Sequence, residues 1–152
     1  MSLRVLAPVT GSAVALTDVP DPVFAEAMVG PGIAVDPGRA AQAQVRAPVT
    51  GTVAKLHPHA LIVLADGGRG VLVHLGIDTV ELDGAGFTLH VSEQDAVTAG
   101  DVLVTFSPSS VADGGRSPLT PVVALDAAAD ALTVAVRPGD QVTAGEELFT
   151  WT

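Results

Sequence analysis

The side chains with the clearest chemical potential in this sequence are four histidines, His57, His59, His74 and His90, in a chain without cysteine. The lack of cysteine excludes disulfides, thiolate nucleophiles and cysteine-based metal sites. A neutral imidazole is a competent nucleophile near neutral pH, and a hydrogen bond to its second nitrogen can fix its orientation. The histidines are therefore the candidate nucleophiles of this chain.

Two of these histidines flank a predicted hairpin. A strand-like segment, 60–65, follows His59, another, 71–73, precedes His74, and the glycine-rich stretch 66–70 between them has the composition of a turn. A turn centred near residues 66 and 67 would place His59 directly opposite His74, with Cβ atoms about 4.5–5.5 Å apart. A register shift of one residue would put the two rings on opposite faces.

Two adjacent imidazoles suit phosphoryl transfer. One ring can attack phosphorus while the other donates hydrogen bonds to the phosphoryl oxygens, over which charge is spread in the transition state. The structural alternative is that each histidine is an ordinary packed or solvated residue at a strand end.

The segments that must position these residues read as short strands rich in Val, Leu, Ile and Thr, separated by Gly, Pro and Asp. Ala7-Pro8-Val9-Thr10-Gly11 recurs at 47–51, and a second pentapeptide at 97–101 recurs in similar form at 142–146. We predict an all-β fold, a duplicated β-sandwich or flattened barrel with one or two very short helices. The candidate strands are 45–49, 61–65, 71–75, 102–106 and 122–125, and the candidate helical turns are 22–29 and 127–132.

Composition predicts one domain over residues 1–152, since 48% apolar and 16% charged residues can form a single core. The longest uncharged run, 5–17, falls short of the roughly 20 residues of a membrane span, and no signal peptide is evident. We expect a cytoplasmic monomer without membrane insertion. A net charge of −10 opposes nucleic-acid binding and either favours a basic protein partner or only maintains solubility.

A specific resemblance appears at Val73-His74-Leu75-Gly76-Ile77-Asp78-Thr79-Val80-Glu81-Leu82. This segment closely resembles the phosphorylation site of the glucose-type IIA components of the bacterial phosphoenolpyruvate-dependent sugar phosphotransferase system, the EIIA type-1 domains. The resemblance extends from about residue 3 to residue 151 and includes the stretches 18–26, 29–34 and 119–123. It implies a duplicated β-sandwich, in agreement with the repeats.

The resemblance implies a phosphohistidine carrier for sugar uptake, a component of a phosphotransferase. Phosphate would pass from the histidine phosphocarrier protein to this chain and then to the IIB domain of a permease for glucose or N-acetylglucosamine, without a cofactor. The implied site comprises His74 as phosphorylated nucleophile, His59 as stabiliser of the phosphoryl group, the carboxylates Asp21 and Asp78, the apolar residues Val23, Phe24, Met28 and Val29, and Gly76.

The sequence departs from the family before its second histidine. The family commonly has a threonine two positions earlier and a slightly longer loop, whereas this chain reads Leu56-His57-Pro58-His59. The chain also has neither an amphipathic N-terminal extension nor a linker to a further domain, so we expect a free-standing subunit.

Two alternative functions stay open, and a third is disfavoured. A regulatory binding protein could report sugar supply through the phosphorylation state of His74. A lysostaphin-type zinc hydrolase could use His57, His59, His74 and Asp78, although the motif order is reversed relative to those enzymes; weak zinc binding by His59 and His74 alone would also fit a carrier. A lipoyl or biotin carrier is disfavoured because Lys55 lies within a strand-like segment rather than at a hairpin tip.

Overall fold

The computed structural model describes residues 2–152 as a largely β molecule with two short α-helices and three 3₁₀ turns, which confirms the predicted fold class. The elements follow the order β1 Leu3–Leu6, β2 Gly11–Ala15, η1 Leu16–Asp18, α1 Pro22–Ala25, β3 Gly32–Asp36, β4 Ala43–Arg46, β5 Gly51–His57, β6 Ala60–Leu64, β7 Gly70–His74, η2 Thr79–Leu82, β8 Phe87–Leu89, β9 Ala96–Val97, β10 Val102–Phe106, α2 Pro108–Asp113, β11 Thr120–Ala124, η3 Ala129–Ala131, β12 Leu132–Val134, β13 Gln141–Val142 and β14 Glu147–Trp151.

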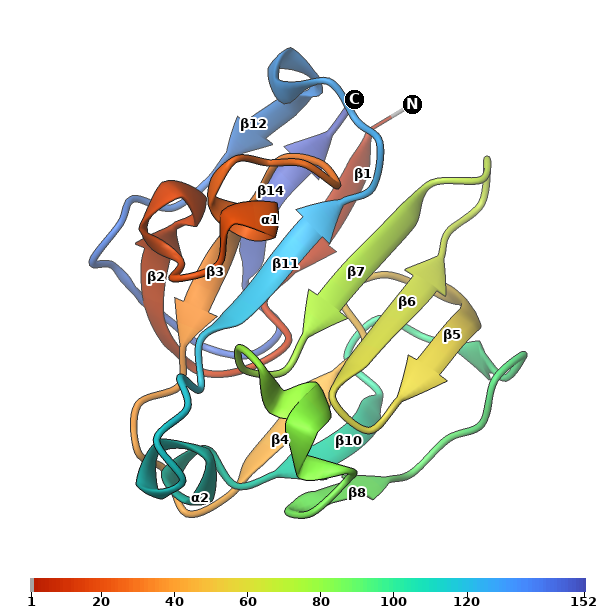
Figure 1. The fold of residues 1–152 in the computed structure, drawn as a ribbon. Coiled ribbons are helices and arrows are strands. Elements are labelled where there is room, and N and C mark those ends of the chain that lie inside the picture. The colour runs from red at the N-terminus through yellow and green to blue at the C-terminus, as the bar shows by residue number, and fades with distance from the viewer. Residues whose placement is uncertain (1) are drawn as a thin grey trace.

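The strands form one large sheet and two small ones. The large sheet has eight strands in the order β13-β2-β3-β11-β7-β6-β5-β9, and the small sheets are β1-β14-β12 and β4-β10-β8. Figure 1 shows β12 and β14 at one end of the molecule and β8 and β10 at the other end. Between the sheets lies an apolar core dominated by valine and leucine.

The strand order is symmetric about its centre, and this symmetry explains the sequence repeats. Strands β1, β2 and β3 of the first repeat correspond to β4, β5 and β6 of the second. The backbone bonds correspond as well: Leu6 N donates to Pro48 O at 2.9 Å, and Arg46 N donates to Pro8 O at 2.8 Å. Each repeat thus stabilises the other through its Ala-Pro-Val-Thr-Gly turn, so the pentapeptide recurs because the same crossing occurs twice.

Glycine ends the pentapeptide in both copies because two backbones come very close there. A Cβ built on Gly11 would lie 2.0 Å from the carbonyl oxygen of Asp36, and one built on Gly51 would lie 2.1 Å from that of Leu64. Real side chains never approach a carbonyl so closely, so each position accepts only a residue without Cβ.

The two repeats differ most on the outer face of the large sheet. In the first repeat, residues 16–31 separate β2 from β3, whereas in the second only Pro58 and His59 separate β5 from β6. The longer connection contains α1, which lies over β3 and β11 (Figure 1). Its apolar side chains form a second small core with residues of these strands and of the loop after β7: Leu16, Val19, Phe24, Ala34, Ile77 and Val123. This cover exists over one half of the sheet only.

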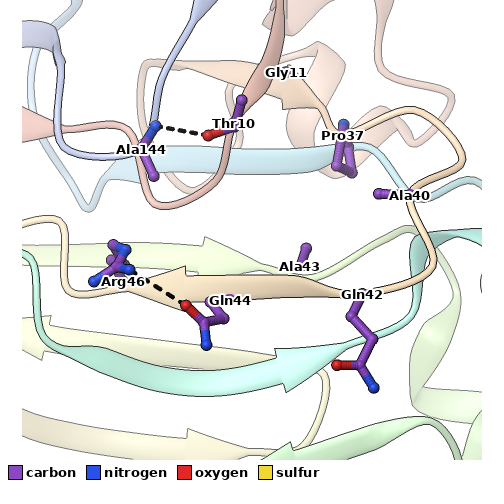
Figure 2. A pocket seen from close by; sticks show the side chains of 9 residues that line it. All are labelled: Thr10, Gly11, Pro37, Ala40, Gln42, Ala43, Gln44, Arg46 and Ala144. Atoms are coloured by element: carbon purple, nitrogen blue, oxygen red, sulfur yellow. Dashed lines mark hydrogen bonds between the residues drawn. The ribbon is translucent and has the colours of Figure 1, made fainter.

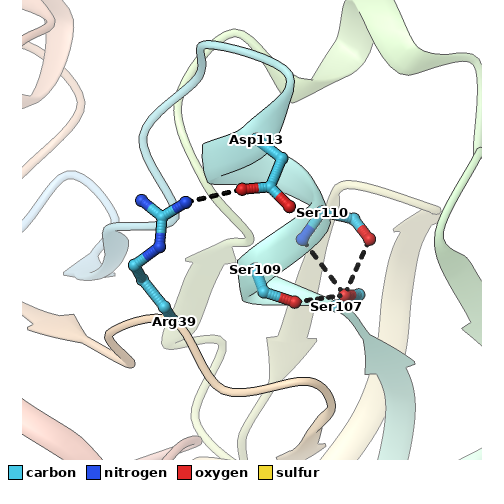
Figure 3. A network of polar contacts seen from close by, with 5 residues as sticks. All are labelled: Arg39, Ser107, Ser109, Ser110 and Asp113. Atoms are coloured by element: carbon cyan, nitrogen blue, oxygen red, sulfur yellow. Dashed lines mark hydrogen bonds and ion pairs between the residues drawn. The ribbon is translucent and has the colours of Figure 1, made fainter.

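All five predicted strands form, and four of them have shifted ends. The predicted strand 45–49 is observed as β4, Ala43–Arg46, because its second half forms the Pro48 turn. The predicted helical turn 22–29 contains α1, and 127–132 contains the 3₁₀ turn η3 followed by the start of β12. The prediction missed α2, although Ser107 before Pro108 is a helix-start signal. Figure 3 shows the Ser107 hydroxyl accepting from Ser110 N, and the ion pair of Asp113 with Arg39.

Candidate active site

His74 is the last residue of β7, and a tight turn immediately after it holds its ring. The Nδ1 atom of His74 lies 2.5 Å from the carbonyl oxygen of Gly76. A carbonyl can only accept, so Nδ1 carries the proton and Nε2 keeps the free lone pair. His74 is half-buried, so the residue is not sealed from solvent.

Gly76 allows the turn that places this carbonyl. Its φ is +84°, a conformation that residues with a side chain rarely adopt, and a Cβ there would lie 2.6 Å from Cγ2 of Thr79 and 2.9 Å from Ser117 O. The buried Thr79 hydroxyl donates to Leu75 O at 2.7 Å, which closes the turn. The sequence Leu75–Thr79 therefore builds a rigid cradle for His74.

His59 lies beside His74, but the predicted strand register is wrong by one residue. His74 pairs with Ala60 rather than with His59, and Leu75 N donates to His59 O at 2.7 Å. The expected consequence, rings on opposite faces, does not follow. The ring centroids of His59 and His74 are 5.5 Å apart at an interplanar angle of 65°. His59 belongs to the two-residue turn before β6, where the alternation of side chains within a strand does not apply.

Phe24 also contacts the His74 ring. Its ring centroid lies 5.2 Å from that of His74 in an edge-to-face arrangement, and the side chain is only 5% exposed. Asp21 begins α1 by accepting a hydrogen bond from Val23 N at 2.9 Å, with Pro22 in the first turn. The local sequence Asp-Pro-Val-Phe thus starts the short helix that brings Phe24 onto the histidine.

The site favours the neutral form of both histidines. Burial lowers the pKa of His74, while the Gly76 carbonyl and the Asp21 and Asp78 carboxylates oppose this effect. Burial also lowers the pKa of His59, helped by the nearby rings of His74 and His57. A neutral His74 with a free Nε2 is a nucleophile, and the neutral ring of His59 offers one N–H donor.

The other predicted site residues lie around this pair in different settings. Asp78 is exposed and begins η2. Val23 and Met28 are 39% and 69% exposed, whereas Val29 is half-buried and its carbonyl accepts from Asp126 N. Exposed apolar side chains of this kind are suited to contact with a protein surface.

Sequence reasoning did not place His57 in a carrier site, yet it is part of the cluster. Its ring lies 5.5 Å from that of His59 at an angle of 19°, a nearly parallel stack. The signal available in the sequence is the short spacing of the two histidines, because only Pro58 separates His57 from His59. The adjacent outer face of the sheet, which α1 leaves uncovered, forms a shallow, mainly apolar hollow lined by Lys55, His57, Ala60, Leu61, Ile62 and Leu72.

Two further grooves occupy equivalent places in the two repeats. A groove of about 620 Å³ runs between β4 and the turn at Thr10, whose hydroxyl accepts from Ala144 N (Figure 2). A groove of about 340 Å³ occupies the equivalent place beside β1, where Thr50 accepts from Ala99 N. No imidazole lines either groove, so neither competes with the histidine cluster as the site of chemistry.

Comparison with known proteins identifies the family of this chain. A model of the phosphoenolpyruvate-dependent sugar phosphotransferase system EIIA 1 family matches residues 3–130. The chain belongs to this family. Its structure is similar to that of glucose permease IIA from Mycoplasma capricolum, with a TM-score of 0.87, 34% sequence identity, and coverage of 99% of this chain and 96% of the other. The family resemblance and the duplicated β fold expected from the sequence are therefore confirmed.

Two further observations concern alternatives to an EIIA carrier. Within residues 2–152, no group of three or more histidine and acidic side chains is arranged to hold a metal ion. His57, His59, His74 and Asp78, the residues named for the hydrolase alternative, do not form such a group. Over the same residues, no helix is long and apolar enough to cross a bilayer.

Proposed function

We propose that this EIIA chain is a phosphohistidine carrier in which Nε2 of His74 accepts a phosphoryl group from the histidine phosphocarrier protein and passes it to a IIB domain of a permease for glucose or N-acetylglucosamine. The observation that carries the proposal is the His74 ring, whose Nδ1 is held by the Gly76 carbonyl and which lies beside the ring of His59. Membership of the family supports the direction of transfer.

Each of the two transfers breaks one bond to phosphorus and forms another. The lone pair of Nε2 attacks phosphorus as the bond between phosphorus and the donor's imidazole nitrogen breaks, and no proton leaves His74 because Nδ1 keeps its own. The phosphorylated ring gains positive character, which the Gly76 carbonyl oxygen stabilises. In the second transfer, the bond from Nε2 to phosphorus breaks as the acceptor's nucleophile bonds to phosphorus.

His59 is positioned to stabilise the phosphoryl group during transfer. Its neutral ring can donate one hydrogen bond to a phosphoryl oxygen, and an adjacent dianionic phosphoryl group would raise its pKa and favour a second proton on this ring. His59 thereby strengthens its interaction when charge accumulates on the oxygens, which is the condition for lowering the barrier.

The surroundings favour a protein partner rather than a small substrate. Val23 and Met28 are exposed beside the site, and the uncovered hollow over β5, β6 and β7 adjoins His57. Asp21 and Asp78 are close enough to His74 to influence its pKa. Their carboxylates would repel a free phosphate, but they suit a donor that presents a cation together with apolar side chains.

The decisive experiment uses the protein with phosphoenolpyruvate, enzyme I and the histidine phosphocarrier. We expect a mass increase of one phosphate that is labile in acid and stable in base, and we expect its complete loss in His74→Ala. His90→Ala is the matched control, because His90 is an exposed histidine that bonds Thr105 away from the cluster. Phosphate on the His74→Ala variant would disprove the assignment of the nucleophile.

A further inference from the structure

The third imidazole of the cluster has a defined geometry that the proposed transfer does not use. His57 is the last residue of β5 and pairs with Ala60, so these two residues close the hairpin around Pro58 and His59. The rings of His57 and His59 are 5.5 Å apart and only 19° from parallel, whereas His59 meets His74 at 65°. His59 therefore presents a face to His57 and lies at a steep angle to His74.

The backbone of the turn is well held, but the ring of His59 is not. Pro58 has a fixed φ and packs against the loop after η2, where a Cβ built on Gly84 would lie 3.4 Å from Cγ of Pro58. Within residues 2–152, no hydrogen bond reaches either ring nitrogen of His59. A histidine ring rotates broadly about its last side-chain bond unless contacts restrain it.

We propose that His57 is a positioning residue for phosphoryl transfer: its imidazole face restrains the His59 ring so that a ring nitrogen stays directed toward the group carried by His74. This inference rests on the proposed function of His59 and His74. The stack acts before phosphate arrives, because it limits the orientations that His59 can adopt. The His59 ring, the hydrogen-bond donor, then loses less conformational freedom in the transfer step.

The outward position of His57 fits such a role better than a contact with phosphate. His57 is exposed. Its ring contacts that of His59, which in turn contacts His74, but no contact between the His57 and His74 rings is seen among the described residues. Its repulsion of a proton on His59 also helps to lower the pKa of that residue, which leaves the ring neutral before transfer.

Two substitutions separate stacking from the other properties of an imidazole. His57→Ala removes the ring, and His57→Phe keeps a flat ring without a ring nitrogen; His90→Ala is the control. We expect all three variants to accept phosphate on His74 to the same final extent. We expect His57→Ala to slow onward transfer to the IIB domain by about 2- to 10-fold, the range that an aromatic pair supports, and His57→Phe to restore the rate to within about 2-fold.

The stack itself has a signature independent of activity. In the unphosphorylated protein, the ring protons of His59 should shift in the proton NMR spectrum of His57→Ala, because the ring current of its neighbour is lost, and should return toward their original positions in His57→Phe. Normal onward transfer by His57→Ala, or equal slowing in both His57 variants, would overturn the positioning role. Failure of the wild-type protein to accept phosphate would instead remove the proposed function on which it rests.

Discussion

At the scale of single residues, the site combines one imidazole held by a hydrogen bond and one held by ring contacts. His74 is bound through Nδ1 to Gly76 O and contacts Phe24, whereas His59 contacts only other rings among the described side-chain interactions. A restrained ring suits the nucleophile, whose lone pair must be aligned, and a ring free to adjust its proton count suits the stabiliser.

The role of His59 predicts a separation between receiving and passing on phosphate. In His59→Gln, His74 keeps its hydrogen bond to Gly76 and its contact with Phe24, so it should still be phosphorylated. Onward transfer should fall at least about 100-fold, because the stabilising donor at the phosphoryl oxygens is lost. The measurement is the rate of phosphate loss from purified phosphoprotein mixed with the IIB domain, and an unchanged rate would remove the role assigned to His59.

The lowered pKa values predict how the site responds to acid. Burial favours the neutral ring in both His59 and His74, so their titration midpoints should lie below the usual value of about 6.5. Because the unfolded chain then binds more protons than the folded chain, stability contributed by these residues should decrease as pH falls through 6.5 toward the folded midpoints. NMR titration of the two rings and urea unfolding between pH 7.5 and about 5 test this sign.

At the scale of elements, the site depends on three connections rather than on strands. The turn after β7 supplies the Gly76 carbonyl, the two-residue connection before β6 supplies His59, and the long connection before β3 supplies Phe24 and Asp21. The strands supply a stiff frame on which these connections meet, the usual division between scaffold and function.

The turn after β7 is the most sensitive of the three connections. Gly76→Ala adds a Cβ that would meet Thr79 and Ser117, which should displace the carbonyl that orients His74 and slow phosphate acceptance at least about 10-fold. Gly67→Ala is a matched control, because φ is +85° there and nothing lies within 4 Å. Both variants carry the backbone strain, so equal rates in a phosphorylation assay would contradict the proposed effect on His74.

At the scale of the whole molecule, duplication has produced a symmetric frame with an asymmetric site. The strand order of the large sheet is symmetric about its centre, but α1 covers only the first half of its outer face. His59 and His74 both belong to the second half. The site therefore forms at the edge of this cover, where His74 contacts Phe24 and is half-buried.

The symmetric frame predicts matched losses of stability. Gly11→Ala and Gly51→Ala should each lower the free energy of unfolding by about 2 kcal/mol or more, because each Cβ would overlap a carbonyl oxygen across the crossing. The two losses, measured by urea denaturation, should agree within about 1 kcal/mol. Gly38→Ala, at a φ of +69° with open space around it, should cost about 1 kcal/mol. A small loss at one crossing glycine only would show that the repeats are not equivalent.

Local patterns in the sequence determined much of this protein: the β class, the duplication, the hairpin between the histidines, and the segment Val73–Leu82 that identifies the family. These features depend on residue type and on spacing within one strand or turn, which the order of residues specifies directly. Only the tertiary structure decided that His74 pairs with Ala60, that His59 nevertheless meets it, and that Phe24 and His57 complete the cluster. Those contacts depend on turn conformation and on packing between segments far apart in the chain, for which alternation along a strand carries no information.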